Sequence, residues 1–346
     1  MKKKLFLLDA YALIYRAHFA FIKNPRINSN GLNTSAIFGF CNSLLEVINN
    51  HQPTHLAVVF DPPGGSDREE VFLDYKANRQ EMPEDIRKSI PYIFDILKAM
   101  NIPFKMENGF EADDLIGTLA KQAEKKGYKV FMMTPDKDFG QLVSENIFIY
   151  KPGRGGNPSE ILGPKEVCEK FEVERPEQVI DILGLWGDAV DNIPGIPGIG
   201  EKTAKKLIGI YGSIENLLAN TEDLKGKQKE NVENFAEQGL ISKQLATIIL
   251  DSPVTFDELE FERKEIDEKA ITKILKELEF NQLGKRILGK PIYQEKQMDL
   301  FAGSEIESIS EPTFQTFTSI KPSYQLIEKR DDHIKLVNKL LSQEAV

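Results

Sequence analysis

KLFLLDA (residues 4–10) is a short apolar run that ends near an aspartate, and HLAVVFDP (55–62) and KVFMMTPDKD (129–138) have the same form. Runs of this length and composition predict buried strands. The segments between them have helical periodicity, over 34–50, 83–100 and 111–127. Because strands and helices alternate, we expect an α/β domain with a parallel sheet over residues 1–163.

One aspartate lies near the carboxyl end of each predicted strand: Asp9, Asp61 and Asp136. Ligands of parallel sheets bind in the crevice beyond these ends. A single aspartate there could be a strand-end turn or a helix cap, but three at one edge favour a shared site.

GFEADDLIG (109–117) places three acids ahead of an apolar run: Glu111, Asp113 and Asp114. Helix capping would explain one or two of them, because acids stabilise the first turn of a helix. A third adds repulsion between like charges, and Glu111 and Asp114 are spaced to lie on one helix face. We therefore expect a positive charge beside them.

From about residue 164 the patterns are helical, with no alternating strand, which predicts a second, mostly helical domain over 164–290. It includes WGDAVDNIPGIPGIGEKTAKKL (186–207), with Asp188 and Asp191 near a predicted helix end. Together with Asp138, these complete a candidate set of nine acids: Asp9, Asp61, Glu111, Asp113, Asp114, Asp136, Asp138, Asp188 and Asp191.

Nine carboxylates in one crevice would raise one another's pKa values and oppose folding unless cations neutralise them. Oxygen ligands favour Mg²⁺ or Mn²⁺ over zinc. None of the four histidines is paired with a cysteine or a spaced second histidine, which disfavours a zinc site, a Ser-His-Asp triad and a Cys-His nucleophile. The remaining interpretation is two-metal hydrolysis of a phosphodiester, in which Asp114 could bridge the ions.

The net charge of −10 argues against a nucleic-acid partner only if the acids are spread evenly over the surface. Two cysteines, Cys41 and Cys168, are too few for a disulfide framework and fit a reducing cytosol. The apolar start of the chain is interrupted by Asp9 and Arg16, which disfavours a signal peptide. No stretch approaches the roughly 20 apolar residues of a membrane span.

GIPGIGEKT (195–203) nearly matches a phosphate-binding P-loop, but Glu201 precedes the lysine and the preceding segment is helical. The glycines better suit a hairpin between helices whose N–H groups bind a DNA phosphate, followed by basic residues along the backbone. The alternative is a plain turn with a solvated lysine face. The candidate DNA-binding residues are Gly195, Gly198, Gly200, Lys202, Thr203, Lys205 and Lys206.

The connection from residue 62 to residue 85 is long for a crossover and begins with glycines. Long loops over a strand-end crevice are usually functional or mobile. Lys76 and Arg79 would share one face of a short helix, suited to a scissile phosphate. A surface helix with salt bridges is the alternative.

Several stretches of the chain, in the same order, resemble the 5′-3′ exonuclease domain of bacterial DNA polymerase I, in the flap endonuclease family. The resemblance covers residues 4 to about 290 and is carried by LLDAYALIYRA, THLAVVFDPPG, DYKANR, MPEDIR, GFEADDLIGTLA, DKDFGQLV, ILGP, GDAVDNIPGIPGIGEKTA and SKQLATI. It implies a PIN-like, resolvase-like core followed by a helix-hairpin-helix domain. The departures are Pro135, where a glycine is expected, and Ser66 and Asp67 ahead of Arg68; none of them removes a ligand.

The resemblance also implies roles for single residues. One metal would be held by Asp9, Asp61, Glu111 and Asp113, and a second by Asp136, Asp138, Asp188 and Asp191, with Asp114 between them. Lys76 and Arg79 would contact the scissile phosphate, and Arg16 and Tyr75 would help to seat the 5′ end. Residues 64–100 would form an arch for a single strand, and the glycine hairpin 195–200 would bind duplex DNA with a K⁺ ion.

We therefore expect a monomeric, Mg²⁺-dependent 5′ nuclease, with Mn²⁺ able to substitute, in the bacterial cytoplasm at the nucleoid. Its partners would be nicked or branched duplex DNA with a 5′ flap and RNA-primed DNA. The alternatives are a catalytically silent DNA-binding module and a related single-strand RNase. Residues 291–320 have linker composition, and 321–346 resemble the start of a 3′-5′ exonuclease-like domain.

Overall fold

The computed structural model describes residues 3–153, 157–292 and 337. Residues 3–292, apart from the gap at 154–156, lie in one compact unit that spans 1–294. The predicted linker and the predicted start of a third domain lie outside the described residues, except for 291, 292 and 337. The helices and strands below therefore belong to one unit.

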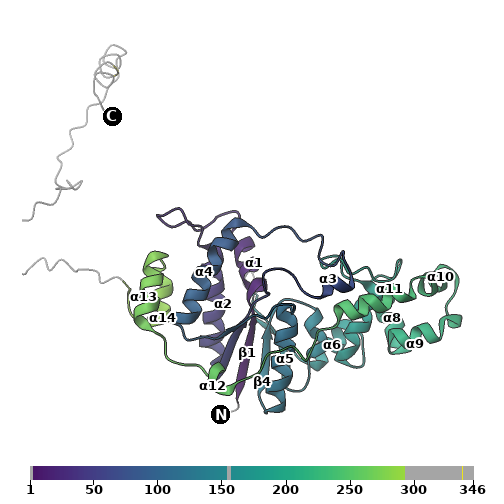
Figure 1. The fold of residues 1–346 in the computed structure, drawn as a ribbon. Helices are drawn as coiled ribbons and strands as arrows, with labels where there is room; N and C mark the ends of the chain where they lie inside the picture. The colour runs from purple at the N-terminus through teal and green to yellow at the C-terminus, as the bar shows by residue number, and fades with distance from the viewer. Residues whose placement is uncertain (1–2, 154–156, 293–336, 338–346) are drawn as a thin grey trace, which may run out of the picture. The chain divides into compact units, whose positions relative to one another are not determined.

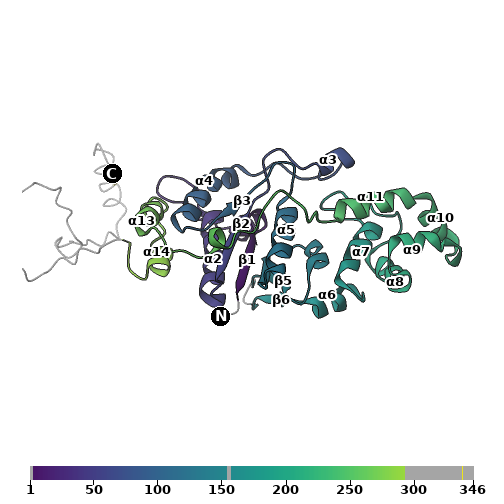
Figure 2. The same ribbon diagram turned by 60° about the horizontal axis from the view of Figure 1, so that its bottom comes forward.

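A six-stranded sheet with the order β3-β2-β1-β4-β5-β6 forms the centre of the unit (Figures 1 and 2). The three predicted strands are β1 (Lys4–Asp9), β2 (His55–Val59) and β4 (Lys129–Met133). Three further strands were not predicted: β3 (Phe104–Lys105), β5 (Ile147–Lys151) and β6 (Glu160–Leu162). All neighbours are parallel except β5 and β6, so the predicted parallel α/β sheet is confirmed, with one antiparallel edge strand.

Alternate residues of β1 enter two different cores, because successive side chains of a strand point to opposite faces of the sheet. Leu5 and Leu7 pack with helix α5 (Ala112–Lys125). Phe6 and Leu8 pack with residues from the helices on the other face. These are α1 (Ala10–Ala20), α2 (Ser35–His51) and α4 (Glu84–Ala99). The predicted helices over 34–50, 83–100 and 111–127 thus exist within two residues of their expected ends.

The region after β6 is helical, as expected. Its helices are α6 (Pro164–Phe171), α7 (Val179–Trp186), α8 (Glu201–Tyr211), α9 (Ile214–Ala219), α10 (Gly226–Asn234) and α11 (Ala236–Ala246). Helix α7 packs against both α8 and α11. Three short 3₁₀ turns, η1 (Asp138–Leu142), η2 (Pro176–Gln178) and η3 (Thr221–Asp223), and the one-turn helix α3 (Arg68–Val71) complete the set before residue 250.

The last helices do not join this helical region, which corrects the expectation of one helical domain over 164–290. After α11 the chain returns past α5, through α12 (Glu258–Phe261), to α13 (Glu268–Glu277) and α14 (Asn281–Leu288). Helix α13 packs against α4, and Ile271 and Leu275 belong to the core of the α1, α2 and α4 face (Figure 1). None of the helices in the described residues is both long and apolar enough to cross a membrane.

We predict that Leu275→Ala lowers the free energy of unfolding by about 2–5 kcal/mol, because the substitution leaves a cavity at a side chain with 0% exposure. Urea denaturation measures the change. Lys273→Ala, on the exposed side of the same helix, is the control and should have little effect. Equal stability of the two variants would mean that α13 does not contribute to the core as described.

Candidate functional site

The sheet brings acids from three strands to one edge. Asp9 ends β1 and pairs in register with Val59 of β2, and Leu8 pairs with Met133 of β4. The carboxyl ends of these strands are therefore level, and Asp61 and Asp136 follow directly from them. The carboxylate of Asp61 accepts a hydrogen bond from the backbone N–H of Ala112 at 3.0 Å, which ties the first turn of α5 to the same edge.

The first group of acids is crowded around Asp113. Burial raises its pKa well above the usual range, and the charges of Asp136, Asp9 and Asp61 raise it further. Burial, followed by the charge of Asp61, raises the pKa of Asp9 to about 7. Asp9 also caps α1 through the N–H of Ala12 at 3.1 Å and accepts from Thr134 Oγ1 at 2.9 Å. Its orientation is thus set by the fold.

The second group follows β4 and α7. Asp136 accepts from the backbone N–H of Asp138 at 2.9 Å. Asp138 Oδ1 is buried without a hydrogen-bond partner, and burial followed by the charge of Asp136 raises the pKa of Asp138 well above its usual range. A two-way backbone bridge between Asp188 and Ile193, at 2.9 and 2.8 Å, closes the loop that carries Asp188 and Asp191.

Basic side chains of the protein are paired with several of these acids. Lys76 Nζ lies 2.7 Å from Glu111 and 3.9 Å from Asp191. Arg79 donates to Asp191 at 2.6 Å, and Lys137 donates to Asp188. Lys76 and Arg79 lie in a run of turns rather than on the predicted short helix, and Lys76 has a left-handed backbone with φ +58°.

The donor chemistry suits a hard cation, since several carboxylates at this edge have raised pKa values and one carboxylate oxygen is buried without a hydrogen bond. In their present positions, however, these side chains are too far apart to bind one ion. Among the described residues, no three carboxylate, imidazole or thiol side chains could hold a metal together. Repulsion between the acids and attraction to Lys76, Arg79 and Lys137 account for this spacing.

The position of Asp114 corrects the prediction that it bridges two metals. Its side chain has 0% exposure, and both oxygens accept from Arg68 at 2.7 Å. One oxygen also accepts from the N–H of Ile249 at 2.8 Å, and the other from the N–H of Glu111 at 3.1 Å. Because these partners occupy the carboxylate, Asp114 is a buried structural anion. The positive charge expected beside the three acids is Arg68, together with Lys76.

Tyr75 and Arg16 also have partners within the protein. The ring of Tyr75 is 5% exposed, and its hydroxyl donates to Glu111 at 3.2 Å. This burial leaves little of the ring for the predicted contact with a 5′ end. Arg16 donates to the carbonyl of Gly153, which follows β5.

The predicted DNA-binding residues divide into two sets. Gly198, Gly200, Lys202 and Lys206 are exposed, and Gly200 caps α8. Gly195 is buried: its N–H donates to Ser242 at 3.0 Å and its carbonyl accepts from Gln238 at 2.6 Å. The half-buried Thr203 N–H donates to the Gly200 carbonyl at 3.0 Å, and Lys205 pairs with Glu201 at 2.9 Å. Gly195 therefore serves the hairpin itself, whereas Lys205 connects α8 to α6 by donating to the carbonyl of Lys170 at 2.8 Å.

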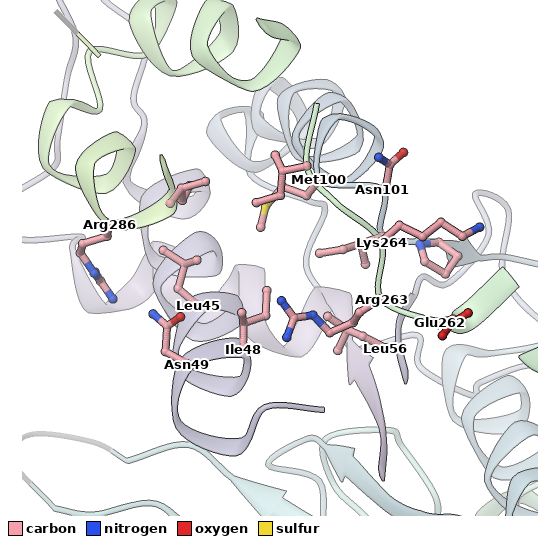
Figure 3. Close-up of a pocket in the computed structure, with 14 residues that line it drawn as sticks. Leu45, Ile48, Asn49, Leu56, Met100, Asn101, Glu262, Arg263, Lys264 and Arg286 are labelled. Carbon is pink, nitrogen blue, oxygen red and sulfur yellow. The ribbon is translucent and has the colours of Figure 1, made fainter. Parts of the chain in front are cut away.

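Sequence reasoning missed Thr134, Lys137 and Gln141. Lys137 had a local signal, because it stands between Asp136 and Asp138. The other two had none. A cavity of about 190 Å³ lies elsewhere, beside Leu56 near the amino end of β2 and Ile102 ahead of β3, and none of the nine acids lines it (Figure 3).

We predict that Asp114→Asn and Arg68→Met each destabilise the fold by about 3–5 kcal/mol, because each leaves a buried partner without its counter-charge. The double variant should lose less than the sum, with a coupling of about 0.5–3 kcal/mol. Urea denaturation measures all three. Glu84→Gln, which breaks the exposed pair with Lys88, is the control and should leave stability nearly unchanged. Additive losses would refute the buried pair.

A second prediction concerns pH. A raised carboxyl pKa means that the folded state binds the proton more tightly than the unfolded chain does. This difference in proton binding stabilises the folded state at low pH. The stabilisation is lost as pH rises through the folded pKa, which for Asp9 is about 7. Without divalent cations, we expect the free energy of unfolding to fall by about 1–3 kcal/mol between about pH 5 and pH 8.

Urea denaturation at both pH values, in chelator and in Mg²⁺, measures this effect. Asp113→Asn should reduce the fall because it removes the most crowded charge, and Mg²⁺ should reduce it in the unsubstituted protein. The same pH dependence in all three cases would show that the acids are not electrostatically coupled.

The chain matches two family descriptions in succession. Residues 4–172 match the 5′-3′ exonuclease, N-terminal resolvase-like domain, and residues 174–269 match the 5′-3′ exonuclease, C-terminal SAM fold. It is 38% identical to the 5′-3′ exonuclease of Aquifex aeolicus over 86% of this chain and 100% of that protein. It is 37% identical to DNA polymerase I of Bacillus subtilis over 96% of this chain, which spans only 37% of that polymerase.

Solved structures share the fold. The T5 5′-exonuclease with bound zinc matches with a TM-score of 0.61 at 20% identity, over 83% of this chain and 99% of that one. The catalytic core of Rad2 in complex with DNA substrate matches with a TM-score of 0.54 at 18% identity, over 84% and 90%. With both domain descriptions matched and a relative covered along its whole length, the chain belongs to the 5′-3′ exonuclease family.

Proposed function

We propose that the chain is a divalent-cation-dependent 5′ nuclease, with Mg²⁺ as the working ion and Mn²⁺ as a substitute. Its substrates would be duplex DNA with a 5′ flap or nick and RNA-primed DNA, cut by phosphodiester hydrolysis in replication and repair. We place it in the bacterial cytoplasm, at the nucleoid, as a monomer. The relatives support this proposal through their names, since they are exonucleases and DNA polymerases.

The observation that carries the proposal is the crowding of carboxylates at one edge of the sheet. Asp9, Asp113 and Asp138 come from separate elements, and burial raises the pKa of each. The charges of neighbouring acids, Asp136 among them in all three cases, raise these pKa values further. Asp138 Oδ1 is buried without a hydrogen-bond partner, and Lys137 Nζ lies 3.8 Å from it. Cations bound there would neutralise this repulsion and so stabilise the fold. Structures of T5 nucleases contain metal ions.

The proposed ligands are the nine predicted acids without Asp114: Asp9, Asp61, Glu111, Asp113, Asp136, Asp138, Asp188 and Asp191. Bound divalent cations would supply an activated water and charge stabilisation for the leaving oxygen. The protein's own part is to orient these oxygens. Asp9 does so through Ala12 and Thr134, and Asp61 through Ala112.

Lys76 and Arg79 would hold the scissile phosphate after exchanging partners. Both now contact acids that we propose as ligands, Glu111 and Asp191. When cations neutralise these acids, the two basic groups become available to a phosphate, which accepts from lysine and arginine in the same way as a carboxylate does. Cation binding and substrate binding would therefore favour each other.

Duplex DNA would bind at the glycine hairpin. Gly198 and Gly200 expose backbone at the start of α8, whose N-terminus favours a phosphate. Lys202 and Lys206 are exposed on the following helix. A K⁺ ion at the hairpin and an arch formed by residues 64–100 remain part of the proposal. Structures of a T5 flap endonuclease and of the catalytic core of Rad2, which share the fold, contain DNA and support a DNA partner.

We predict that the protein cuts a 3′-labelled 5′-flap duplex near its junction in Mg²⁺ and not in chelator. Asp113→Asn should lower the rate by at least about 100-fold while binding of the flap DNA is largely retained, because it removes a ligand rather than a DNA contact. Denaturing gels measure cutting, and fluorescence anisotropy measures binding. Asp251→Asn, at an exposed acid after α11, is the control and should cut normally. Binding without cutting in both Mg²⁺ and Mn²⁺ would favour the silent module.

A further inference from the structure

Five consecutive residues, Leu245–Ile249, which are the last two of α11 and the three that follow it, are bound to the two acid-bearing regions through their backbone. We call this segment the strap. Its hydrogen bonds are Arg68 Nε to Leu245 O at 3.1 Å, Gln141 Nε2 to Ala246 O at 2.9 Å, Arg68 Nη2 to Thr247 O at 2.9 Å, Ile248 N to Gln141 Oε1 at 2.9 Å, and Ile249 N to Asp114 Oδ1 at 2.8 Å. Three side chains from distant parts of the chain, Arg68, Asp114 and Gln141, thus hold the strap.

Gln141 joins the strap to the second group of acids. Its side chain is 6% exposed, and its Nε2 also donates to the backbone carbonyl of Asp138 at 2.9 Å. Asp138 therefore provides both this backbone carbonyl and the carboxylate oxygen that has no hydrogen-bond partner. An amide that donates twice and accepts once fixes the backbone from which Asp138 projects.

Arg68 joins the strap to the first group. Besides its two strap carbonyls, it bonds Asp114 through two nitrogens and lies 3.3 Å from Glu111. Asp114 in turn accepts from the backbone N–H of Glu111, so Arg68 and Asp114 together fix the start of α5. Asp113 stands in that same first turn.

The strap is continuous with the helical region. It begins at the end of α11, and α11 packs along α7, which runs into the loop with Asp188 and Asp191. One segment therefore connects α5, η1 and the helices that carry the proposed duplex-binding hairpin. The distance between the two groups of acids therefore depends on how the strap connects α5, η1 and α7.

We propose that the strap, held by Gln141 and Arg68, sets the separation of the two carboxylate groups and so determines how well they bind catalytic cations. The inference rests on the proposed function. Gln141 and Arg68 are positioning residues, because they act on the acids through the backbone and through Asp114. Partners that orient ligands in this way typically contribute about 10- to 100-fold in metal affinity or activity.

Gln122 offers a matched control. From α5, its Nε2 donates to Val254 O at 2.9 Å and its Oε1 accepts from Phe256 N at 2.8 Å. It thus holds the same returning chain by the same kind of bonds, a few residues further on, without a contact to any of the nine acids. Loss of either amide leaves one backbone carbonyl and one N–H of this segment without their side-chain partner.

The experiment compares Gln141→Leu with Gln122→Leu in the full chain. The first readout is the rise in melting temperature on titration with Mg²⁺ or Mn²⁺ without DNA. Gln141→Leu should need about 10- to 100-fold more cation for half of the rise, whereas Gln122→Leu should need the same amount as the unsubstituted protein. The second readout is flap cutting, in which Gln141→Leu should lower kcat about 10-fold or more with little change in KM for DNA.

Equal cation dependence of the two variants would overturn the strap as a positioning element, even if both lose stability. If Gln141→Leu does not fold, Gln141→Met, which keeps the length of the side chain, is measured instead, and the same comparison decides. Failure of the unsubstituted protein to cut or to respond to cations would overturn the proposed function itself. Normal cutting by all the variants would overturn only the further inference.

Discussion

Repulsion between buried carboxylates is the constraint on which the rest of this structure depends. The parallel sheet brings Asp9, Asp61 and Asp136 to one edge, and the start of α5 adds Asp113. Burial strengthens the repulsion, because charges interact more strongly where water is excluded. Neighbouring features oppose it: the N–H of Ala112 binds Asp61, and the N–H of Ala12 binds Asp9. The result is a cluster of acids at this edge, in which burial and neighbouring charges raise the pKa values of Asp9 and Asp113.

The basic residues beside these acids differ in burial and in how firmly they are bound. Arg68 is 8% exposed, and its four hydrogen bonds to Asp114 and the strap, together with its ion pair with Glu111, leave it no freedom to meet a substrate. Arg79 is 52% exposed in its side chain and holds one carboxylate. Because the Arg79 side of this pair is exposed, it exchanges its partner at less cost than the buried pair of Arg68 and Asp114. Burial therefore distinguishes Arg68, which is a fixed part of the site, from Arg79, which is suited to respond to a ligand.

Much of this could be predicted from sequence because the signals were local. The alternation of apolar runs and helical patterns gives the sheet, and the aspartates that end the runs must then share an edge. The neighbours Asp113 and Asp114 show the limit. They are chemically identical, and their different roles depend on Arg68 and Ile249, which are distant in sequence. The return of α13 to α4 was missed for the same reason: its amphipathic pattern indicates a buried face but not the helix that covers it.

The strap has a consequence for a chain that is still being synthesised. Asp9 leaves the ribosome early, but the backbone that fixes α5 and η1 is bound by residues 245–249, up to 135 positions further along than Asp114. Domains fold as units during synthesis at about 5–20 residues per second. The stretch from the end of β6 at Leu162 to the end of the strap at Ile249 therefore takes about 4–17 seconds to synthesise. During that interval the strap does not yet hold the acids in their final positions. A nascent or prematurely terminated chain would therefore carry the acids without the geometry needed to cut nucleic acid near the ribosome.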